Sequence, residues 1–247
     1  MDSPARTCSE MSRTMVSGPS GLLTCLLTFR ASRTMSRVIG ILVAWLIALA
    51  ASAALASQSN VILVYGDSLS AGYGIRVEQG WVSLLQQKIL QEGYGFHVVN
   101  ASISGETTAG GLSRLPHVLS VQQPHIVLLE LGANDGLRGL PLTQTQANLD
   151  QIITQLQAHR VAVLLLGVRL PPNYGERYTR EFSGMYEQLA AAHKIPLLPF
   201  LLERVALTPG LMQQDGLHPN AQAQPLLLEN VWPRLVPLMR AAAGAGA

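Results

Sequence analysis

The sequence from Ser57 onward contains no cysteine, because Cys8 and Cys25 both lie before that residue. This absence excludes disulfides, a cysteine nucleophile and cysteine metal sites from that part of the chain. Charged residues are also few, at 13% of the chain, and from Ser57 onward 12 basic residues face 13 acidic ones. Such a balance leaves no basic surface for a nucleic acid. The histidines show no metal-ligand spacing, so we expect no metal and no cofactor.

The sequence also lacks an uninterrupted apolar run of the ~20 residues that usually span a bilayer. An apolar stretch from Val38 to Ala50 follows Arg37 and precedes small residues up to Ala56. A basic segment, an apolar segment and small residues in this order are typical of a cleavable export signal. We therefore expect residues 1–56 to be an N-terminal extension with a signal peptide that is cleaved after Ala56.

Three alternatives to this interpretation stay open. Cleavage after Ala53 would fit a second small-residue pattern, and the small residues that extend the apolar stretch would also fit a membrane anchor. Translation from Met35 would account for residues 1–34, which show no periodic apolar pattern. The remaining residues, 57–247, are enough for one domain with a sizeable core.

Short apolar runs alternate with segments of helical spacing from residue 61 onward. This alternation predicts right-handed βαβ units and an α/β fold, with a central parallel sheet of about five strands between two layers of helices. A break at Pro225 and a kink at Pro233 are expected in the last helix. We expect strands at 61–65, 97–99, 125–131, 161–168 and 195–198, and helices at 81–92, 107–120, 143–159, 174–193 and 221–239.

Polar, glycine-containing loops follow each of the first three expected strands. They comprise residues 66–68, 100–105 and 132–135. Because ligand sites of open parallel sheets form at the carboxyl ends of the strands, these loops are expected to meet at one edge. That convergence indicates a functional site more strongly than any single loop does.

Ser68 follows the first strand directly, where a hydroxyl can be exposed. A serine needs a base to accept its proton and a third group to orient that base. Asp215 and His218 are three residues apart, so the carboxylate can bind imidazole Nδ1 and leave Nε2 for Ser68. The pattern predicts a Ser68, His218 and Asp215 triad. The structural alternatives are helix caps at Ser68 and Asp215 and a turn at His218.

Attack on a carbonyl creates an oxyanion, which needs fixed hydrogen-bond donors. The backbone N–H groups of Ser68 and Gly105 and the side-chain amide of Asn134 are the candidates. The alternatives are a tight turn at Gly105 and loop hydrogen bonding at Asn134. For Asp67 and Asp135 we favour loop hydrogen bonding over a catalytic role.

Four blocks of this sequence resemble those of the SGNH, or GDSL, hydrolase superfamily. They are Gly-Asp-Ser-Leu at 66–69, glycine at 105, Gly-x-Asn-Asp at 132–135 and Asp-x-x-His at 215–218. Longer matches at 66–73, 100–107, 130–139, 169–175 and 196–200 are similar to the branch of bacterial periplasmic enzymes with acyl-CoA thioesterase, arylesterase and lysophospholipase activity. The resemblance implies a flavodoxin-like fold, the same triad and oxyanion residues, and export to the periplasm.

The resemblance also suggests a substrate groove. In that superfamily the loop after the third block moves against acyl chains, which would place Leu140 and Pro141 beside the substrate. Leu170 and Pro171 follow the fourth strand and are expected to line the same groove. The sequence departs from that branch at Ala133, where a second glycine is usual, at Glu106, where aspartate is usual, and in a slightly longer segment at 81–100.

The expected function is hydrolysis of acyl or aryl esters and thioesters through an acyl-enzyme, by a monomer with a small-molecule substrate. One alternative is a carbohydrate O-acetyl esterase of the same fold, and another is a binding protein without catalysis. Glu130 lies inside an apolar strand, where a lone carboxylate is costly. We therefore predict a structural salt bridge between Glu130 and Arg169.

Overall fold

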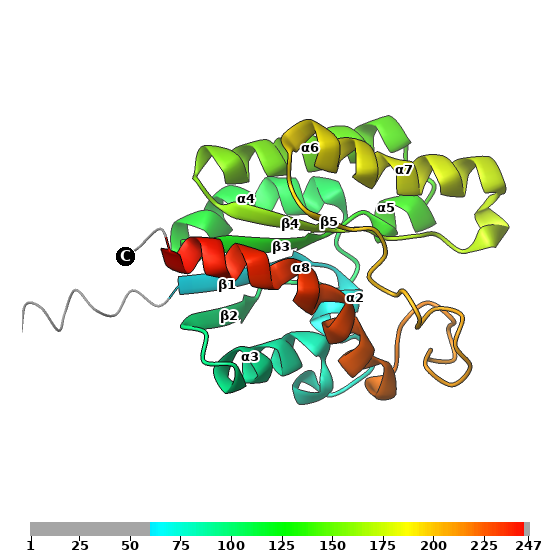
Figure 1. Ribbon diagram of the computed structural model, residues 1–247. Coiled ribbons are helices and arrows are strands. Elements are labelled where there is room, and N and C mark those ends of the chain that lie inside the picture. The colour runs from blue at the N-terminus through cyan, green and yellow to red at the C-terminus, as the bar shows by residue number, and fades with distance from the viewer. Residues whose placement is uncertain (1–59, 245–247) are drawn as a thin grey trace, which may run out of the picture. The chain divides into compact units, whose positions relative to one another are not determined.

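A computed structural model of the chain describes residues 60–244 (Figure 1). The expected N-terminal extension, its signal peptide and its cleavage site lie outside these residues. The described residues form an α/β structure, as the alternation of apolar runs and helical segments predicts.

Five parallel strands form a single sheet in the order β2-β1-β3-β4-β5. The register pairs Leu63 with Val99 on one side and with Val127 on the other, so β1 is an inner strand. The central strands are mostly apolar, with Glu130 at the end of β3 as the charged exception, because helices bury both of their faces. These findings confirm the predicted fold class. The strands are β1 (Asn60–Gly66), β2 (Phe96–Asn100), β3 (Ile126–Glu130), β4 (Ala162–Leu166) and β5 (Leu197–Leu198).

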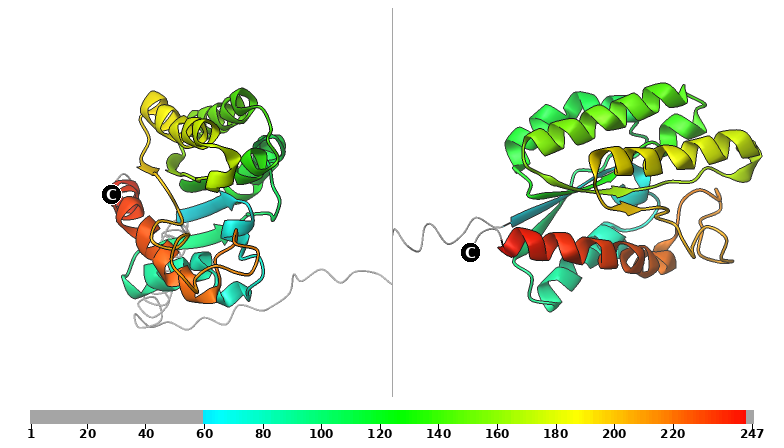
Figure 2. Two further views of the ribbon diagram at one scale, coloured as in Figure 1. Left: turned by 90° about the vertical axis from the view of Figure 1, so that its right-hand side faces the viewer. Right: turned by 45° about the horizontal axis from the view of Figure 1, so that its top comes forward.

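Helices cover the two faces of the sheet in two layers. Helices α3 and α8 lie on one face, while α4, α6 and α7 lie on the other (Figure 2). Within residues 60–244 no helix is both long and apolar enough to span a membrane. The helices are α2 (Ser68–Ala71), α3 (Trp81–Gln91), α4 (Thr108–Gln122), α5 (Ala133–Leu137), α6 (Leu142–Ala158), α7 (Glu176–His193) and α8 (Gln224–Gly244), with short 3₁₀ helices at Val77–Gln79, Pro172–Tyr174 and Ala221–Ala223.

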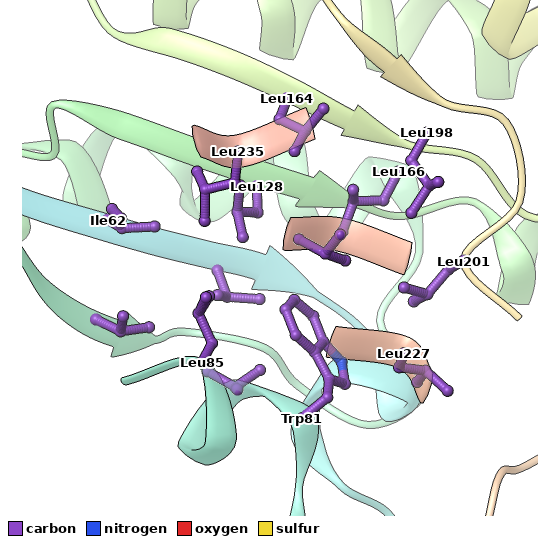
Figure 3. Packing of buried hydrophobic residues seen from close by; sticks show 14 of the residues in the cluster. Ile62, Trp81, Leu85, Leu128, Leu164, Leu166, Leu198, Leu201, Leu227 and Leu235 are labelled. Carbon is purple, nitrogen blue, oxygen red and sulfur yellow. The ribbon is translucent and has the colours of Figure 1, made fainter. Parts of the chain in front are cut away.

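The core below the sheet is made of alternate strand residues and one stripe of each covering helix. Ile62 and Leu128 point from the sheet toward Trp81 and Leu85 of α3 and Leu227 of α8 (Figure 3). All five are fully buried. Full burial of one such leucine is worth about 1.5–3 kcal/mol, so this packing holds the strand ends in place.

The last helix differs from its prediction. It begins at Gln224 and continues through Pro225 and Pro233 to Gly244. The predicted break at Pro225 is wrong because this residue occupies the first helical turn, where the missing N–H has no intrahelical acceptor. The fifth strand is also shorter than expected, with only Leu197 and Leu198.

Candidate active site

The site lies where the order of the strands reverses, at the carboxyl ends of β1 and β3. β1 is followed along the chain by β2 on one side, whereas β3 leads on to β4 on the other side. Open α/β sheets have their ligand crevice at such a switch point. Ser68 comes two residues after the end of β1, and Asn134 comes four residues after the end of β3.

Ser68, His218 and Asp215 form a continuous hydrogen-bonded chain. His218 Nε2 lies 2.8 Å from Ser68 Oγ, and His218 Nδ1 lies 2.6 Å from Asp215 Oδ2. The other carboxylate oxygen of Asp215 accepts the backbone N–H groups of Leu217 and His218 at 2.9 and 3.0 Å. This arrangement can remove a proton from Ser68 and stabilise the imidazolium that forms.

Asp215 is held in its ionised form. Partial burial of Asp215 opposes its charge, but the backbone N–H and imidazole of His218 and the N–H of Leu217 outweigh burial and lower the pKa of Asp215 to about 2. The carboxylate therefore remains charged at neutral and mildly acidic pH.

Two neighbours of His218 were not predicted from the sequence. The ring of Tyr73 lies against the imidazole, with 4.6 Å between the ring centroids. Gln213 donates its side-chain amide to the carbonyls of Tyr73 at 2.7 Å and Pro219 at 3.1 Å, and its backbone N–H to the carbonyl of His218. Gln213 thus joins the loop that carries His218 to the segment that follows Ser68.

Two backbone donors are available beside Ser68 Oγ. Among residues 60–244, the N–H groups of Ser68 and Gly105 donate to no other group. Gly105 has φ of +81°, a conformation that favours glycine, and its carbonyl accepts the guanidinium of Arg138 at 3.0 Å. Both N–H groups can therefore receive the oxygen of a bound carbonyl.

The amide of Asn134 is already engaged by the protein. Its Nδ2 lies 3.0 Å from Asp67 Oδ2 and 3.0 Å from the carbonyl oxygen of Glu106. These two acceptors account for both N–H bonds of the amide. To bind an oxyanion, Asn134 must release or share one of them.

The predicted salt bridge between Glu130 and Arg169 is wrong. Glu130 is fully buried and accepts hydrogen bonds from Ser70 and Asp67, whereas Arg169 is exposed beside Glu203 and the ring of Phe200. The register explains this outcome, because the last pair across β3 and β4 is Leu129 with Leu165, and a continuation by one residue would place position 166 beside Glu130. Arg169 lies three residues beyond that position, outside the sheet.

Asp135 joins the two loops that carry Gly105 and Asn134. Its buried carboxylate accepts the N–H and the hydroxyl of Thr108 at 2.9 and 2.6 Å. Asn148 of α6 donates in turn to the Thr108 hydroxyl at 3.0 Å. The loop-bonding role that we favoured for Asp135 agrees with these contacts.

A cavity of about 820 Å³ opens beside Ser68 and His218. Most of the described residues that line the cavity are apolar. The basic residues among them are Arg169 and His218, and none of them is an aspartate or a glutamate. Main contributions come from the segments after β1, β3, β4 and β5. The lining residues include Leu69, Tyr73, Leu137, Val168, Leu170, Pro171, Pro172, Phe200, Leu202, Ala206, Leu207, Met212 and Leu217.

The predicted groove residues divide into two pairs. Leu170 and Pro171 line the cavity, whereas Leu140 and Pro141 are absent from its lining and Leu137 contributes instead. The carbonyl of Leu140 accepts the hydroxyl of Tyr178, so the chain turns toward α7 at this point.

Residues 199–214 supply much of the cavity wall, and this role is not predicted from the sequence. Its signal was present in the sequence. A stretch of about 20 residues between two elements is unusual in a compact domain unless it is functional. This stretch also contains Phe200, Leu207 and Met212 just before the Asp-x-x-His block.

The described residues contain no group of three or more His, Cys, Asp or Glu side chains that could hold a metal ion.

Comparison with known protein families gives a match over most of the described residues. The profile of the GDSL-like Lipase/Acylhydrolase family matches residues 64–225. Esterase TesA of Pseudomonas aeruginosa is 52% identical over 183 residues, which cover 74% of this chain and 91% of that protein. The arylesterase of Vibrio mimicus is 47% identical over 182 residues, which cover 73% of this chain and 91% of that enzyme.

Solved structures agree with the sequence relatives. The crystal structure of TesA superimposes with a TM-score of 0.71 at 54% identity, covering 72% of this chain and 99% of that chain. The psychrotrophic esterase EstA from Pseudoalteromonas sp., in a structure inhibited by monoethylphosphonate, gives a TM-score of 0.70 at 42% identity, covering 73% of this chain and 99% of that one.

Proposed function

This chain belongs to the GDSL-like lipase/acylhydrolase family and is an ester-bond hydrolase, and we propose that Ser68, His218 and Asp215 form its catalytic triad. The observation that carries this proposal is the unbroken path from Asp215 through His218 to Ser68 Oγ, with contacts of 2.6 and 2.8 Å. Nucleophile, base and orienting carboxylate are all within hydrogen-bond reach.

In the proposed reaction, Ser68 Oγ attacks the carbonyl carbon of the substrate while His218 Nε2 takes the hydroxyl proton. The new oxyanion receives the N–H groups of Ser68 and Gly105. When the tetrahedral intermediate collapses, His218 gives its proton to the leaving alcohol or thiol and an acyl-enzyme remains. Water then repeats the sequence, with His218 as the base, and releases the acid.

The proposed substrates are acyl thioesters, aryl esters and lysophospholipids. The apolar cavity supports an acyl or aryl group on the carbonyl side. Carboxylates that would bind sugar hydroxyls are absent from its lining, so the lining gives no support to a carbohydrate O-acetyl esterase. Curated relatives are named esterase, arylesterase and thioesterase 1/protease 1/lysophospholipase L1.

We also propose that the enzyme works as a monomer in the periplasm. The proposal of export rests on the basic, apolar and small-residue pattern of residues 36–56.

The experiment that tests the triad compares Ser68→Ala with the parent protein on p-nitrophenyl butyrate. Loss of the nucleophile should lower kcat by about 10⁴-fold or more, with little change in unfolding temperature. A Ser68→Ala protein that cleaves the ester as fast as the parent would contradict the proposal and favour a binding protein. A series of p-nitrophenyl esters and acyl-CoAs of increasing chain length, compared by kcat/KM, then defines the acyl group that the cavity prefers.

A further inference from the structure

Glu130 is a fully buried carboxyl group directly behind the nucleophile, and the proposed reaction does not use it. Its Oε2 accepts the hydroxyl of Ser70 at 2.8 Å and the backbone N–H of Asp67 at 3.2 Å. A Cβ atom on Gly66 would lie 2.6 Å from this oxygen, so glycine leaves the space that the carboxyl group fills. Among the described residues, Oε1 of Glu130 has no ordinary hydrogen-bond donor beside it.

Asp67 is a second fully buried carboxyl group, and it contacts the first one. The backbone N–H of Asp67 donates to Glu130 Oε2, and each of the two carboxyl groups shifts the pKa of the other. Two carboxyl groups can share a hydrogen bond only if one of them carries a proton. Burial raises the pKa of Asp67 to about 6, while burial and the charge of Asp67 raise the pKa of Glu130 well above its usual range. Geometry agrees with a proton on Glu130, because Oε2 already accepts two donors whereas Oε1 has no donor beside it and is free to carry the hydrogen.

Asp67 connects this pair to the oxyanion site. Its Oδ1 accepts the N–H of Leu69 in the first turn of α2, and its Oδ2 accepts the amide of Asn134 at 3.0 Å. Glu130 is thus linked to Asp67. Asp67 is linked in turn to Asn134 and to the first turn of α2, the helix that begins at Ser68. Two other titratable groups interact with the pair: His218 acts on Asp67, and both carboxyl groups act on buried Tyr186.

We propose that Glu130 is a positioning residue that stays protonated in the active enzyme and donates a hydrogen bond to ionised Asp67, which in turn fixes Asn134 and the start of α2 for attack by Ser68. This inference rests on the proposed triad but does not follow from it. Neutral Glu130 leaves one negative charge in the buried pair, and Asp67 uses that charge to hold the amide of Asn134. Ionised Glu130 would place two like charges side by side without a buried cation.

The first test compares Glu130→Gln with Glu130→Leu by kcat and KM on p-nitrophenyl butyrate. Glutamine keeps an acceptor for Ser70 and a donor for Asp67, whereas leucine supplies neither. Glu130→Leu should lower kcat about 10- to 100-fold with KM changed less than about 3-fold, and Glu130→Gln should recover most of kcat. Equal loss in both variants, or no loss in Glu130→Leu, would overturn the proposal.

A matched control separates positioning from stability. Gln86→Leu also deletes a polar side chain that accepts a backbone N–H, in this case from Val98 in the middle of β2. It should lower the unfolding temperature without lowering kcat. If Gln86→Leu lowers kcat as much as Glu130→Leu, the effect is a general loss of packing and the proposal fails.

The second test is a double-mutant cycle that joins Glu130→Leu with Asn134→Ala. If Glu130 acts through Asn134, the leucine change should cost less than about 3-fold in kcat once Asn134 is gone. If the kcat loss of the double variant equals the product of the two single losses, the residues act independently, and the proposed link from Glu130 to Asn134 is overturned. The Ser68→Ala variant shows which proposal has failed. If Ser68→Ala is active, the triad is contradicted. If Ser68→Ala is inactive but the Glu130 variants have the kcat of the parent, only the role of Glu130 is contradicted.

The third test observes the proton and does not depend on the folding of Glu130→Leu. The infrared spectrum of the parent protein at neutral pH should contain the C=O stretch of a buried protonated carboxylic acid, and Glu130→Gln should lack it. A parent spectrum without that band, or a band that survives in Glu130→Gln, would overturn the proposal.

Discussion

At the scale of single residues, the reactivity of Ser68 depends on how rigidly the imidazole of His218 is held in its orientation toward Ser68 Oγ. Asp215 fixes Nδ1 and Tyr73 limits the tilt of the ring. These contacts come from segments far apart in the sequence, so the orientation of the His218 ring also depends on the hydrogen bonds that join those segments. A shift of about 1 Å in such a site can cost about 10²-fold in rate.

The first residue-scale prediction concerns Gln213. Gln213→Ala removes the amide that holds the carbonyls of Tyr73 and Pro219, so kcat should fall about 10- to 100-fold through misplacement of His218. The matched control is Gln214→Ala, because Gln214 is exposed and makes no hydrogen bond among the described residues. Steady-state kinetics on p-nitrophenyl butyrate measure both variants, and equal kcat values in the two would contradict this assignment.

The second residue-scale prediction concerns acid stability. The pKa of Asp215 is about 2 in the folded chain and 3.8 in the reference state, so its ionised form stabilises the fold above pH 3.8. That contribution is lost as the pH falls from about 4 to 2. The free energy of unfolding, measured by urea titration, should therefore differ between parent and Asp215→Asn at pH 5, and the difference should shrink toward pH 2. A difference that is the same at both pH values would contradict the lowered pKa.

At the scale of elements, helix α4 approaches the sheet closely because residue 111 is glycine. A Cβ at Gly111 would lie 2.5 Å from a methyl carbon of Leu131, whereas a Cβ at Gly184 of α7 would meet nothing within 4 Å. Both glycines lie within helices. They therefore form a matched pair in which only the contact with the sheet differs.

Gly111→Ala should destabilise the fold by about 1–3 kcal/mol through overpacking. Gly184→Ala should stabilise it by about 0.5–1 kcal/mol, since alanine favours a helix and restricts the unfolded chain. Chemical denaturation of both variants checks the prediction, and it would be contradicted if Gly111→Ala were as stable as the parent.

The elements could largely be predicted from the sequence because their patterns are local. Strand β3, for example, is a continuous apolar run, and α6 has a clear apolar stripe. The partner of Glu130 could not be predicted, because strand register and loop direction decide which side chains meet across the sheet. Arg169 follows the predicted fourth strand and was therefore expected near Glu130, but it lies beyond the last paired residues of β3 and β4.

The residues of the candidate site could be predicted from the sequence more readily than the contacts that hold them in place. Glycine-containing segments after β1, β2 and β3 had to meet at one edge of a parallel sheet. Ser68, Gly105 and Asn134 do follow these strand ends, with Ser68 at the start of α2 and Asn134 in the short helix α5. The contacts of Tyr73 and Gln213 with the His218 loop could not be foreseen, since they depend on the path of segment 199–220, which has little regular structure.

At the scale of the whole molecule, residues 36–56 carry the basic, apolar and small-residue pattern of a cleavable export signal. We therefore expect the exported protein to begin at Ser57 when the full chain is produced in a Gram-negative host. N-terminal sequencing of the enzyme from the periplasmic fraction checks this. A first residue at position 54 would favour cleavage after Ala53, and an uncleaved chain in the membrane fraction would favour an anchor.

The identity of the nucleophile is the central claim for the molecule as a whole. A fluorophosphonate reacts only with an activated serine, and mass spectrometry of the digested protein locates the adduct. We predict one adduct per chain, on the peptide that contains Ser68, and none on Ser68→Ala at the same reagent concentration. An adduct on another serine, such as Ser70 or Ser104, or labelling of Ser68→Ala at the rate of the parent, would contradict the triad.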